Sequence, residues 1–397
     1  MESILRVFAR RNFKSSYHPN SKVKVQFIIT NEDNSYVHLS HLPLTFEIIF
    51  KVGEEEEESK LFLTQEDHNL SCVFKEEEKN KNNNNNGVYD ISFQLPSLSS
   101  LSSSSSSSSS FQIFTSSPSC PDVLPFLSDY IQIVPSSSSL KPSNLTLFTC
   151  YRKLSCHVNN NNITEKKYLY IKENYGLTLG SHIWDASIVL SQYLLTLPKE
   201  ISGTVLELGA GCGVVGLSLG LTLSPHNLMT GLLTDVSSQL PLLKENIQIN
   251  KLNHCCTTQE MDIFSSSSSS SFQSSSSSSS SSSSFQSSSS SSSSSSSFLS
   301  SDLNIFDYIV GADILYNKDG HDSLMQVIIR NMGYHTTVYL AQKERRAGLL
   351  NKEEAYKGWE RDDWFEEQYP QLKRERLYEH CGVVIWKLVH RSYCDLN

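Results

Sequence analysis

The sequence predicts an α/β domain built on a mostly parallel sheet and preceded by a β-rich, sandwich-like domain. Short runs rich in β-branched and aromatic residues fill residues 1–150 and show no helical period. From about residue 165, strand-like and helix-like segments alternate, as in parallel sheets that are covered on both faces. The 397 residues are enough for two domains, each with a core of its own.

The β-rich domain contains no arrangement of residues that indicates chemistry. One run, GVYDISFQLP at residues 87–96, alternates apolar and polar side chains and ends at Pro96. We therefore expect a half-buried strand near a sheet edge, where proline is tolerated. A scaffold and a partner-binding module are equally compatible with this domain.

Low-complexity tracts interrupt both domains. They cover residues 54–58 (Glu), 82–86 (Asn), 102–110 and 265–301 (Ser). Such tracts bury too little apolar surface to offset the entropy of ordering them, so we expect disordered loops. Loop-closure entropy rises only logarithmically with length, so the block at 265–301 fits as an insertion within the second domain, which we place at residues 165–397.

Charge and cysteine content exclude several classes of protein. The net charge of -9 and the pI near 5.8 argue against nucleic acid as a partner. The nine cysteines lack zinc-site spacing, which indicates reduced thiols and no bound metal. The start lacks the apolar core of a secretory signal, and five glycines with Glu207 argue against a membrane span at residues 205–223. We expect a monomer in the cytoplasm or nucleus.

The elements of the second domain follow from their apolar patterns. A helix at residues 183–195, capped by Ser181, opens the domain. Expected strands then alternate with helices, and two final strand runs form a closing antiparallel hairpin. The expected strands are 204–208, 229–235, 255–262, 306–314, 336–342, 372–380 and 382–390, and the helices are 214–223, 239–250 and 323–332.

The stretch VLELGAGCGVVGL at residues 205–217 predicts a ligand-binding turn between a buried strand and a helix. Gly211, Gly213 and Gly216 have the spacing of the dinucleotide fingerprint, so NAD is one candidate ligand. The longer pattern, which starts at Glu207 and includes Gly209, favours a ligand without a pyrophosphate. A carboxylate at this turn repels a diphosphate and attracts a cation.

Further acids follow the next strands along the chain. Asp235 ends the second strand, where an acid accepts hydrogen bonds from ribose hydroxyls. Asp262, beside Ile263, follows the third strand and is a candidate partner of an adenine amino group. Asp313 and Tyr316 follow the fourth strand, where an acceptor substrate would enter. The alternative for each acid is an ordinary polar residue at a strand end.

Four motifs together resemble a known family. IWDASIVLSQYL, VLELGAGCGVVGL, LLTD and YIVGADILY occur in the order found in the protein-lysine N-methyltransferases of methyltransferase family 16. The resemblance covers roughly residues 175–345 and the closing hairpin. It implies a seven-stranded, Rossmann-like class I methyltransferase fold, S-adenosyl-L-methionine as cofactor, and a protein substrate with a target lysine, such as a chaperone or a translation factor.

The resemblance also implies roles for individual residues. Asp313 and Tyr316 match the D-x-x-Y element at the lysine channel, where we assign Asp313 to the incoming ammonium and Tyr316 to the channel wall. The departure from the family is Ile263, which stands where members often carry tryptophan. Residues implied to contact the donor are Trp184, Gly209, Ala210, Gly211, Asp235 and Ala312.

Three alternatives remain open from the sequence. The same donor could serve a small-molecule or nucleic-acid acceptor. The turn could bind NAD in an oxidoreductase, although no Tyr-x-x-x-Lys element follows the sheet. A non-enzymatic adaptor with a relic domain is the third. We interpret His182 as a surface or capping residue and Cys212 as a small filler within the turn.

Overall fold

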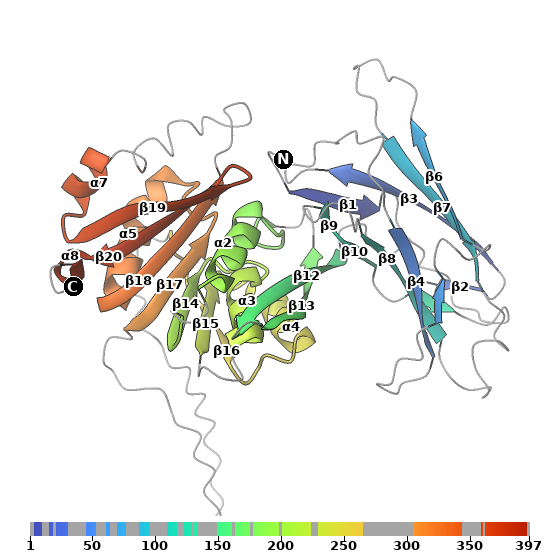
Figure 1. Ribbon diagram of the computed structural model, residues 1–397, viewed down its shortest axis with the longest axis horizontal. Helices are drawn as coiled ribbons and strands as arrows, with labels where there is room; N and C mark the ends of the chain where they lie inside the picture. Colours follow the sequence, from blue (N-terminus) through green and yellow to red (C-terminus); the bar gives the residue numbers. More distant parts are fainter. Residues whose placement is uncertain are drawn as a thin grey trace, which may run out of the picture.

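The computed structural model describes the parts of the chain that form the sheets, the helices and the loops next to them (Figure 1). The described residues are 4–9, 16–18, 21–30, 45–52, 61–63, 70–76, 87–95, 109–116, 123–128, 131–133, 149–160, 163–174, 178–197, 201–223, 229–264, 305–343, 359 and 362–394. The serine block at 265–301 and the tracts at 54–58 and 82–86 lie outside them, as does most of the tract at 102–110.

Two β-sheets form the N-terminal part of the chain. Their strands are β1 Leu5–Ala9, β2 Ser16–Tyr17, β3 Lys22–Thr30, β4 Thr45–Val52, β5 Leu61–Leu63, β6 Leu70–Glu76, β7 Gly87–Gln94, β8 Ser109–Ser116, β9 Val123–Leu124, β10 Phe126–Leu127, β11 Ile131–Ile133, β12 Thr149–Asn160 and β13 Ile163–Asn174. One sheet has the order β6-β7-β3-β1-β9, and the other has β13-β12-β10-β8-β11-β2, with β4 also paired to β8 and β5. Most pairings are antiparallel, but β1 with β9 and β11 with β2 are parallel.

Alternating apolar residues form the core of this part. Along β3, Val23, Val25 and Phe27 are buried while Lys22 and Lys24 are exposed. The ring of Phe27 meets that of Phe126 in the other sheet with centroids 5.2 Å apart. The two sheets therefore contact each other through their apolar faces.

The expected edge position of residues 87–96 is wrong. Strand β7 pairs with β3 on one side and with β6 on the other. Its regular part ends at Gln94, so Pro96 lies beyond the ladder and does not prevent pairing on both sides. The predicted half-burial holds for Ile91 and Phe93, which are buried next to a partly exposed Ser92.

The hairpin β12–β13 connects the N-terminal sheets to the rest of the chain. Its strands pair along their whole length, and β12 continues the second sheet through β10. On the other side, Leu169 and Ile171 of β13 enter the same buried cluster as the helices that follow. The hairpin lies between the two parts of the molecule, as Figure 1 shows.

The C-terminal part is a seven-stranded sheet. Its strands are β14 Thr204–Leu208, β15 Thr230–Asp235, β16 Cys256–Glu260, β17 Phe306–Ala312, β18 Met332–Lys343, β19 Leu372–His380 and β20 Val383–His390. The order is β16-β15-β14-β17-β18-β20-β19, in which the first five strands run parallel and β20 is antiparallel to both of its neighbours. The mostly parallel α/β sheet is as predicted.

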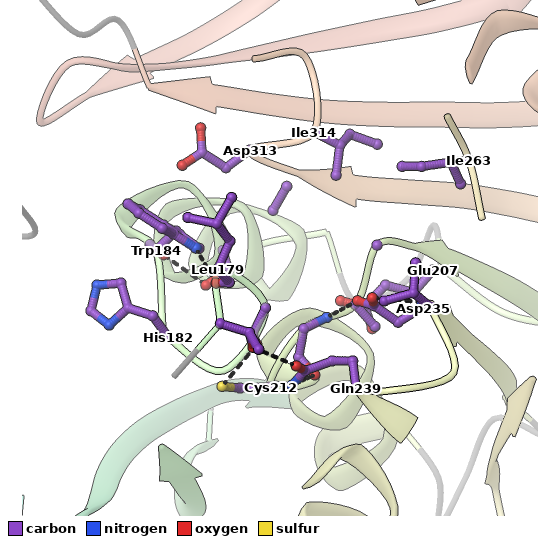
Figure 2. Close-up of a pocket in the computed structure, with 18 of the residues that line it drawn as sticks. Leu179, His182, Trp184, Glu207, Cys212, Asp235, Gln239, Ile263, Asp313 and Ile314 are labelled. Atoms are coloured by element: carbon purple, nitrogen blue, oxygen red, sulfur yellow. Dashed lines mark hydrogen bonds between the residues drawn. The ribbon is translucent and has the colours of Figure 1, made fainter. Parts of the chain in front are cut away.

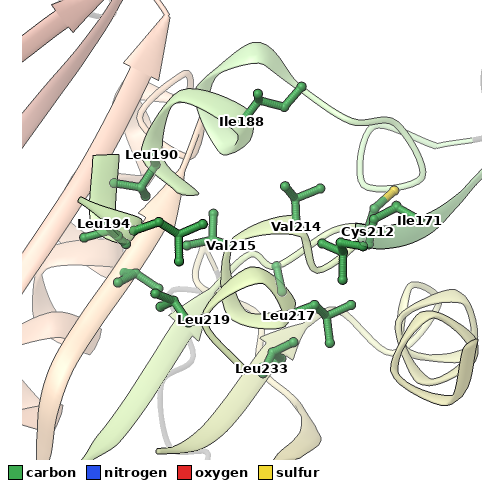
Figure 3. Close-up of a cluster of buried hydrophobic side chains, with 14 of the residues drawn as sticks. Ile171, Ile188, Leu190, Leu194, Cys212, Val214, Val215, Leu217, Leu219 and Leu233 are labelled. Carbon is green, nitrogen blue, oxygen red and sulfur yellow. The ribbon is translucent and has the colours of Figure 1, made fainter. Parts of the chain in front are cut away.

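Helices cover both faces of this sheet. On one face α2 Asp185–Leu195, α3 Val214–Leu223 and α4 Leu240–Ile249 share a core with β14, β15 and the hairpin, part of which Figure 3 shows. On the other face α5 His321–Asn331 and α7 Asp362–Gln368 pack with Leu206, Ile309 and Leu340. Helix α3 is almost wholly buried, which explains its continuous apolar sequence. No helix among the described residues is both long and apolar enough to cross a bilayer.

The predicted start of α2 is wrong. The helix begins at Asp185, and the residue before it, Trp184, has an extended backbone and gives no side-chain cap. The Ser181 hydroxyl instead bonds Thr178 and Gln239. Four residues before the helix thus form a separate loop, and apolar Ile183 belongs to that loop.

Candidate active site

The glycine turn lies at the carboxyl end of β14, next to the point where the strand order reverses between β15 and β17. Open α/β sheets bind ligands at such a point. Gly209, Gly211 and Gly213 have positive φ of 59°, 56° and 82°, a conformation that other residues adopt with strain. The turn closes on itself because Gly213 donates its N–H to the Ala210 carbonyl at 2.8 Å.

The Glu207 side chain is hydrogen-bonded to the helix that follows the turn. It is buried, and its Oε2 accepts the N–H of Gly216 in the first turn of α3 at 2.9 Å. Burial, together with a smaller effect of nearby Asp235, raises the pKa of this carboxyl to about 8, although backbone hydrogen bonds oppose the shift. The expected direct pairing of Glu207 with a cationic ligand therefore competes with its bond to the helix.

Asp235 holds the turn from the next strand. One carboxylate oxygen accepts the N–H of Gly211 at 2.7 Å, and the other accepts the N–H of Val236 at 2.8 Å. Burial raises the pKa of this carboxyl, and the two backbone bonds lower it. The carboxylate fixes both the glycine turn and the end of β15.

A cavity of about 300 Å³ opens at these strand ends. It joins the ends of four parallel strands to the loop before α2, and Figure 2 shows many of its lining side chains. Every site residue expected from the sequence lines this one cavity: Trp184, Glu207, Gly209, Ala210, Gly211, Asp235, Asp262, Ala312, Asp313 and Tyr316.

Trp184 reaches the cavity from the loop before α2. Its indole N–H donates to the Leu179 carbonyl at 2.9 Å, which fixes the ring. Gln239 at the start of α4 bonds the same loop through Thr178 and Ser181 and donates to the Gly211 carbonyl at 3.4 Å. The loop and the glycine turn thus form one wall.

Asp313 lies at the end of β17 with a positive φ of 58°, although it is not glycine. Its N–H donates to the Ala341 carbonyl at 2.7 Å, and its Oδ1 accepts the side-chain N–H of Gln342 at 2.5 Å. The Gln342 Oε1 accepts the N–H of Leu315 at 2.9 Å. Strained backbone held by its surroundings is common at functional sites.

The wall opposite the loop is apolar and carries one phenol. Ile263 and Ile314 are both buried and line the cavity (Figure 2). The Tyr316 ring meets Phe264 edge-on with centroids 5.5 Å apart, and this tyrosine is 44% exposed. Burial and the three neighbouring acids raise the pKa of Tyr316, so its phenol stays neutral at ordinary pH. Asp262 lines the cavity and accepts the N–H of Phe264.

The interpretation of His182 as a surface or capping residue is wrong. His182 is buried, and its Nδ1 lies 3.0 Å from Glu173 of β13. Its ring also meets the edge of the Trp184 ring at 4.8 Å. Burial lowers the pKa of His182, so the imidazole is neutral at pH 7.

Sequence reasoning missed three contributors to the cavity wall. Gln239 and His182 line the cavity but match no motif, because their partners lie far away in the sequence. Gln342, the residue before the last of β18, lies behind the cavity wall and bonds Asp313 and Leu315. A polar residue at the end of a parallel strand was the available signal for Gln342. Among the described residues, no group of three or more His, Cys, Asp and Glu side chains is arranged for a metal ion.

Comparisons with known proteins bear on these observations. Residues 163–271 match the family described as lysine methyltransferase. A UPF0665 family protein of Schizosaccharomyces pombe is 25% identical over 186 residues, which are 45% of this chain and 46% of that protein. Protein-lysine N-methyltransferase EFM6 of Saccharomyces cerevisiae is 34% identical over 96 residues, 21% of this chain and 39% of that protein. EEF1A lysine methyltransferase 3 of Xenopus tropicalis is 27% identical over 186 residues, 45% of this chain and 65% of that protein.

Solved structures resemble the chain more distantly. A SAM dependent methyltransferase from Aquifex aeolicus is 14% identical, with 52% of this chain and 92% of that chain covered at a TM-score of 0.34. PKMT2 from Rickettsia typhi, in complex with AdoHcy, is 17% identical, with 35% and 20% covered at a TM-score of 0.24.

The chain covers less than two thirds of the length of each curated relative described above. The family match and the named relatives nevertheless confirm the resemblance to protein-lysine methyltransferases that the four sequence motifs indicate. They also confirm the expected cofactor, S-adenosyl-L-methionine, at the level of the family. Residues 163–271, which contain the glycine turn, are therefore similar to the lysine methyltransferase family.

Proposed function

We propose that the protein is an S-adenosylmethionine-dependent protein-lysine N-methyltransferase. The observation that carries this proposal is the convergence of the turn that begins at Glu207 and of the pair Asp313 and Tyr316 on one cavity. The two motifs lie about a hundred residues apart in the sequence, on opposite sides of the serine block.

The residues around the cavity fit the proposed donor. A Cβ at Gly209 would come within 2.8 Å of Ile314, and one at Gly211 within 2.9 Å of the Gly180 carbonyl, so both positions need the absence of a side chain. Asp235 offers carboxylate oxygens toward ribose hydroxyls, and Ile263 and Ile314 offer an apolar wall to adenine. Trp184 and Ala312 complete the wall near the methionine end.

The chain's own residues would act mainly by alignment and desolvation. When bound, the donor supplies an electrophilic methyl group on a sulfonium. A free lysine has a pKa near 10.4, so its amine is largely protonated at pH 7. Asp313 would position the incoming ammonium and Tyr316 would wall the channel. Desolvation beside a cation would lower the lysine pKa, so that the ammonium passes its proton to water and the amine stands neutral and aligned in the channel.

The substrate is proposed to be a protein. Two relatives in different vertebrates are named EEF1A lysine methyltransferase 3, so EEF1A is the first substrate to test. The six cysteine thiols that the structure describes favour a reducing compartment. We place the enzyme in the cytoplasm and nucleus, as a monomer. We also infer that residues 1–150 form a sandwich-like domain, which serves either as a scaffold or as a partner-binding module.

Two measurements test this function. Calorimetry of the full chain with S-adenosylmethionine, S-adenosylhomocysteine and NAD should show binding of the first two alone. Incubation with labelled donor and purified EEF1A, followed by peptide mass spectrometry, should then place label on a lysine. Binding of NAD would instead support an oxidoreductase. Absence of binding to all three would support a non-enzymatic adaptor.

A further inference from the structure

A buried arginine from the first strand reaches the loop that lines the donor cavity. Arg6 of β1 is fully buried. Its NH2 donates to the Ile183 carbonyl and to Asp185 Oδ1, both at 2.7 Å, and its NH1 donates to the Ile4 carbonyl at 3.0 Å. One guanidinium thus joins the start of the chain to two residues more than 170 positions away.

Asp185 gathers further contacts at the same place. Its Oδ2 accepts the Ile4 N–H at 3.3 Å and pairs with the ammonium of Lys343, the last residue of β18. Although burial opposes ionisation, Arg6 and Lys343 hold the pKa of Asp185 below its ordinary value. The aspartate is therefore a charged link between β1, the first turn of α2 and the end of β18.

A second buried pair holds the same loop from the hairpin. Arg152 of β12 lies 3.4 Å from Glu173 of β13, and both side chains are fully buried. Glu173 in turn meets His182, three residues before Asp185. The loop residues 182–184, which line the donor cavity, are thus held by the hydrogen bond of His182 to Glu173 on one side and by the Arg6–Asp185 ion pair on the other.

We propose that Arg6 is a positioning residue for the donor cavity, acting through Ile183 and Asp185 on Trp184. The inference rests on the proposed function, because it assumes that this cavity binds the methyl donor. The Ile183 carbonyl immediately precedes Trp184, and Asp185 immediately follows it. A forked guanidinium that bonds both sides of a residue restricts its backbone, which a single point charge does less well.

This role gives the N-terminal sheets a part in donor binding without contact to the donor. Loss of Arg6 leaves Asp185 paired with Lys343, so the aspartate keeps a cation, but the Ile183 carbonyl loses its donor. The loop then gains freedom, and ordering it again opposes binding of the donor. The expected loss is about tenfold in donor affinity, which corresponds to about 1.4 kcal/mol.

The test compares Arg6→Met with Arg6→Lys and a matched control, all in the full chain. Methionine keeps much of the length of the arginine side chain but makes none of its hydrogen bonds. Lysine keeps the positive charge but lacks the forked guanidinium. Phe27→Leu is the control, since Phe27 lies in the N-terminal core away from the loop. Calorimetry gives the affinity for S-adenosylhomocysteine, kinetics give KM for the donor and kcat, and hydrogen exchange reports on residues 178–187.

Arg6→Met should weaken binding of S-adenosylhomocysteine, raise KM for the donor more than it lowers kcat, and speed exchange in residues 178–187. Arg6→Lys should lie between Arg6→Met and the wild type, and Phe27→Leu should lower the melting temperature alone. Equal affinity in all folded variants would overturn the inference while leaving the function intact. If Arg6→Met does not fold, Arg6→Lys decides by the same readings. A wild type that binds no donor would refute the proposed function itself.

Discussion

Two residues that line the cavity have a strained backbone or an unusual pKa, and each leads to a testable prediction. Asp313 keeps a left-handed backbone although glycine would adopt it more easily, and Gln342 holds its carboxylate. Glu207 is a buried carboxyl whose pKa is raised to about 8. Strained residues and carboxyls with shifted pKa values cluster at functional sites, where they serve the reaction although they lower the stability of the fold.

Asp313→Asn should separate binding from turnover. Asparagine has the same size and tolerates positive φ, so the fold and the donor affinity should persist. Turnover should fall by about two orders of magnitude, because the variant lacks the charge that we propose orients the lysine ammonium. Single-turnover methylation and calorimetry measure the two effects. Asp319→Asn, an exposed acid nearby, is the control, and equal turnover in Asp313→Asn would defeat the assignment.

Glu207 makes stability depend on pH. In the folded state this carboxyl binds its proton up to about pH 8, whereas the unfolded chain releases it near pH 4.5. Between these values the folded state holds more protons, so its stability falls as pH rises. Glu207→Gln should therefore be more stable than the wild type at pH 8, by a few kcal/mol at most, and similar to it below pH 4.5.

Urea unfolding from pH 4 to pH 9 measures this difference. The raised pKa of Asp235 acts in the same direction and remains in both proteins. Glu260→Gln, an exposed acid at the end of β16, should leave the slope of stability against pH unchanged. Parallel curves for wild type and Glu207→Gln would show that Glu207 does not titrate in this range.

At the scale of elements, the hairpin β12–β13 is joined to α4 by side-chain amides. Asn250 accepts the Tyr170 N–H at 2.9 Å and donates to the Tyr170 carbonyl at 2.6 Å. Asn246 makes the same pair of bonds with Lys172, at 2.8 and 3.0 Å. The free edge of β13 is thereby paired as if by another strand.

Asn250→Ala should loosen this edge. It removes both bonds from Tyr170 and leaves part-buried backbone groups without them, at a cost of about 1–3 kcal/mol. Hydrogen exchange at the Tyr170 amide should speed up, and the urea midpoint should fall. Gln248→Ala, at an exposed position of the same helix, is the control. Unchanged exchange at Tyr170 would mean that the amide bond contributes nothing to this edge.

The sequence predicts those elements whose pattern is local. Strand β14, the glycine turn and α3 follow from residues 204–223 alone, since the strand and helix periods change at the glycines. The hairpin at residues 149–174 escaped prediction because its polar outer positions obscure the alternation. The sequence also did not predict the roles of Gln342, His182 and Arg6, because these roles depend on partners that are distant in the sequence.

At the scale of the whole molecule, buried ion pairs connect the two parts and should make their contact sensitive to acid. Although burial opposes ionisation, the Arg152 guanidinium and the hydrogen bond with His182 lower the pKa of Glu173 to about 2, and Arg6 and Lys343 lower that of Asp185. Lowered carboxyl pKa values stabilise the fold above the unfolded values of 4.5 and 3.8. That stabilisation is lost as pH falls from about 4.5 to about 2.

The contact between the two parts should therefore weaken with acid more than with salt. Buried pairs are screened little by added ions. Exchange of the backbone amides of residues 178–187, relative to their intrinsic rates, should accelerate below pH 4, and 1 M salt at pH 7 should change it by less than about twofold. Strong acceleration by salt at neutral pH would indicate an exposed, screened contact instead.

The amide bonds between α4 and β13 have a consequence for the length of the hairpin. The two asparagines are four residues apart on a helix, and their partners are two residues apart on a strand. Four residues of a helix and two residues of a strand advance by nearly the same length. The two pairs of bonds therefore fix the register between helix and strand, as main-chain bonds fix it between strands. One added residue between Tyr170 and Lys172 would therefore leave an asparagine facing the wrong peptide group.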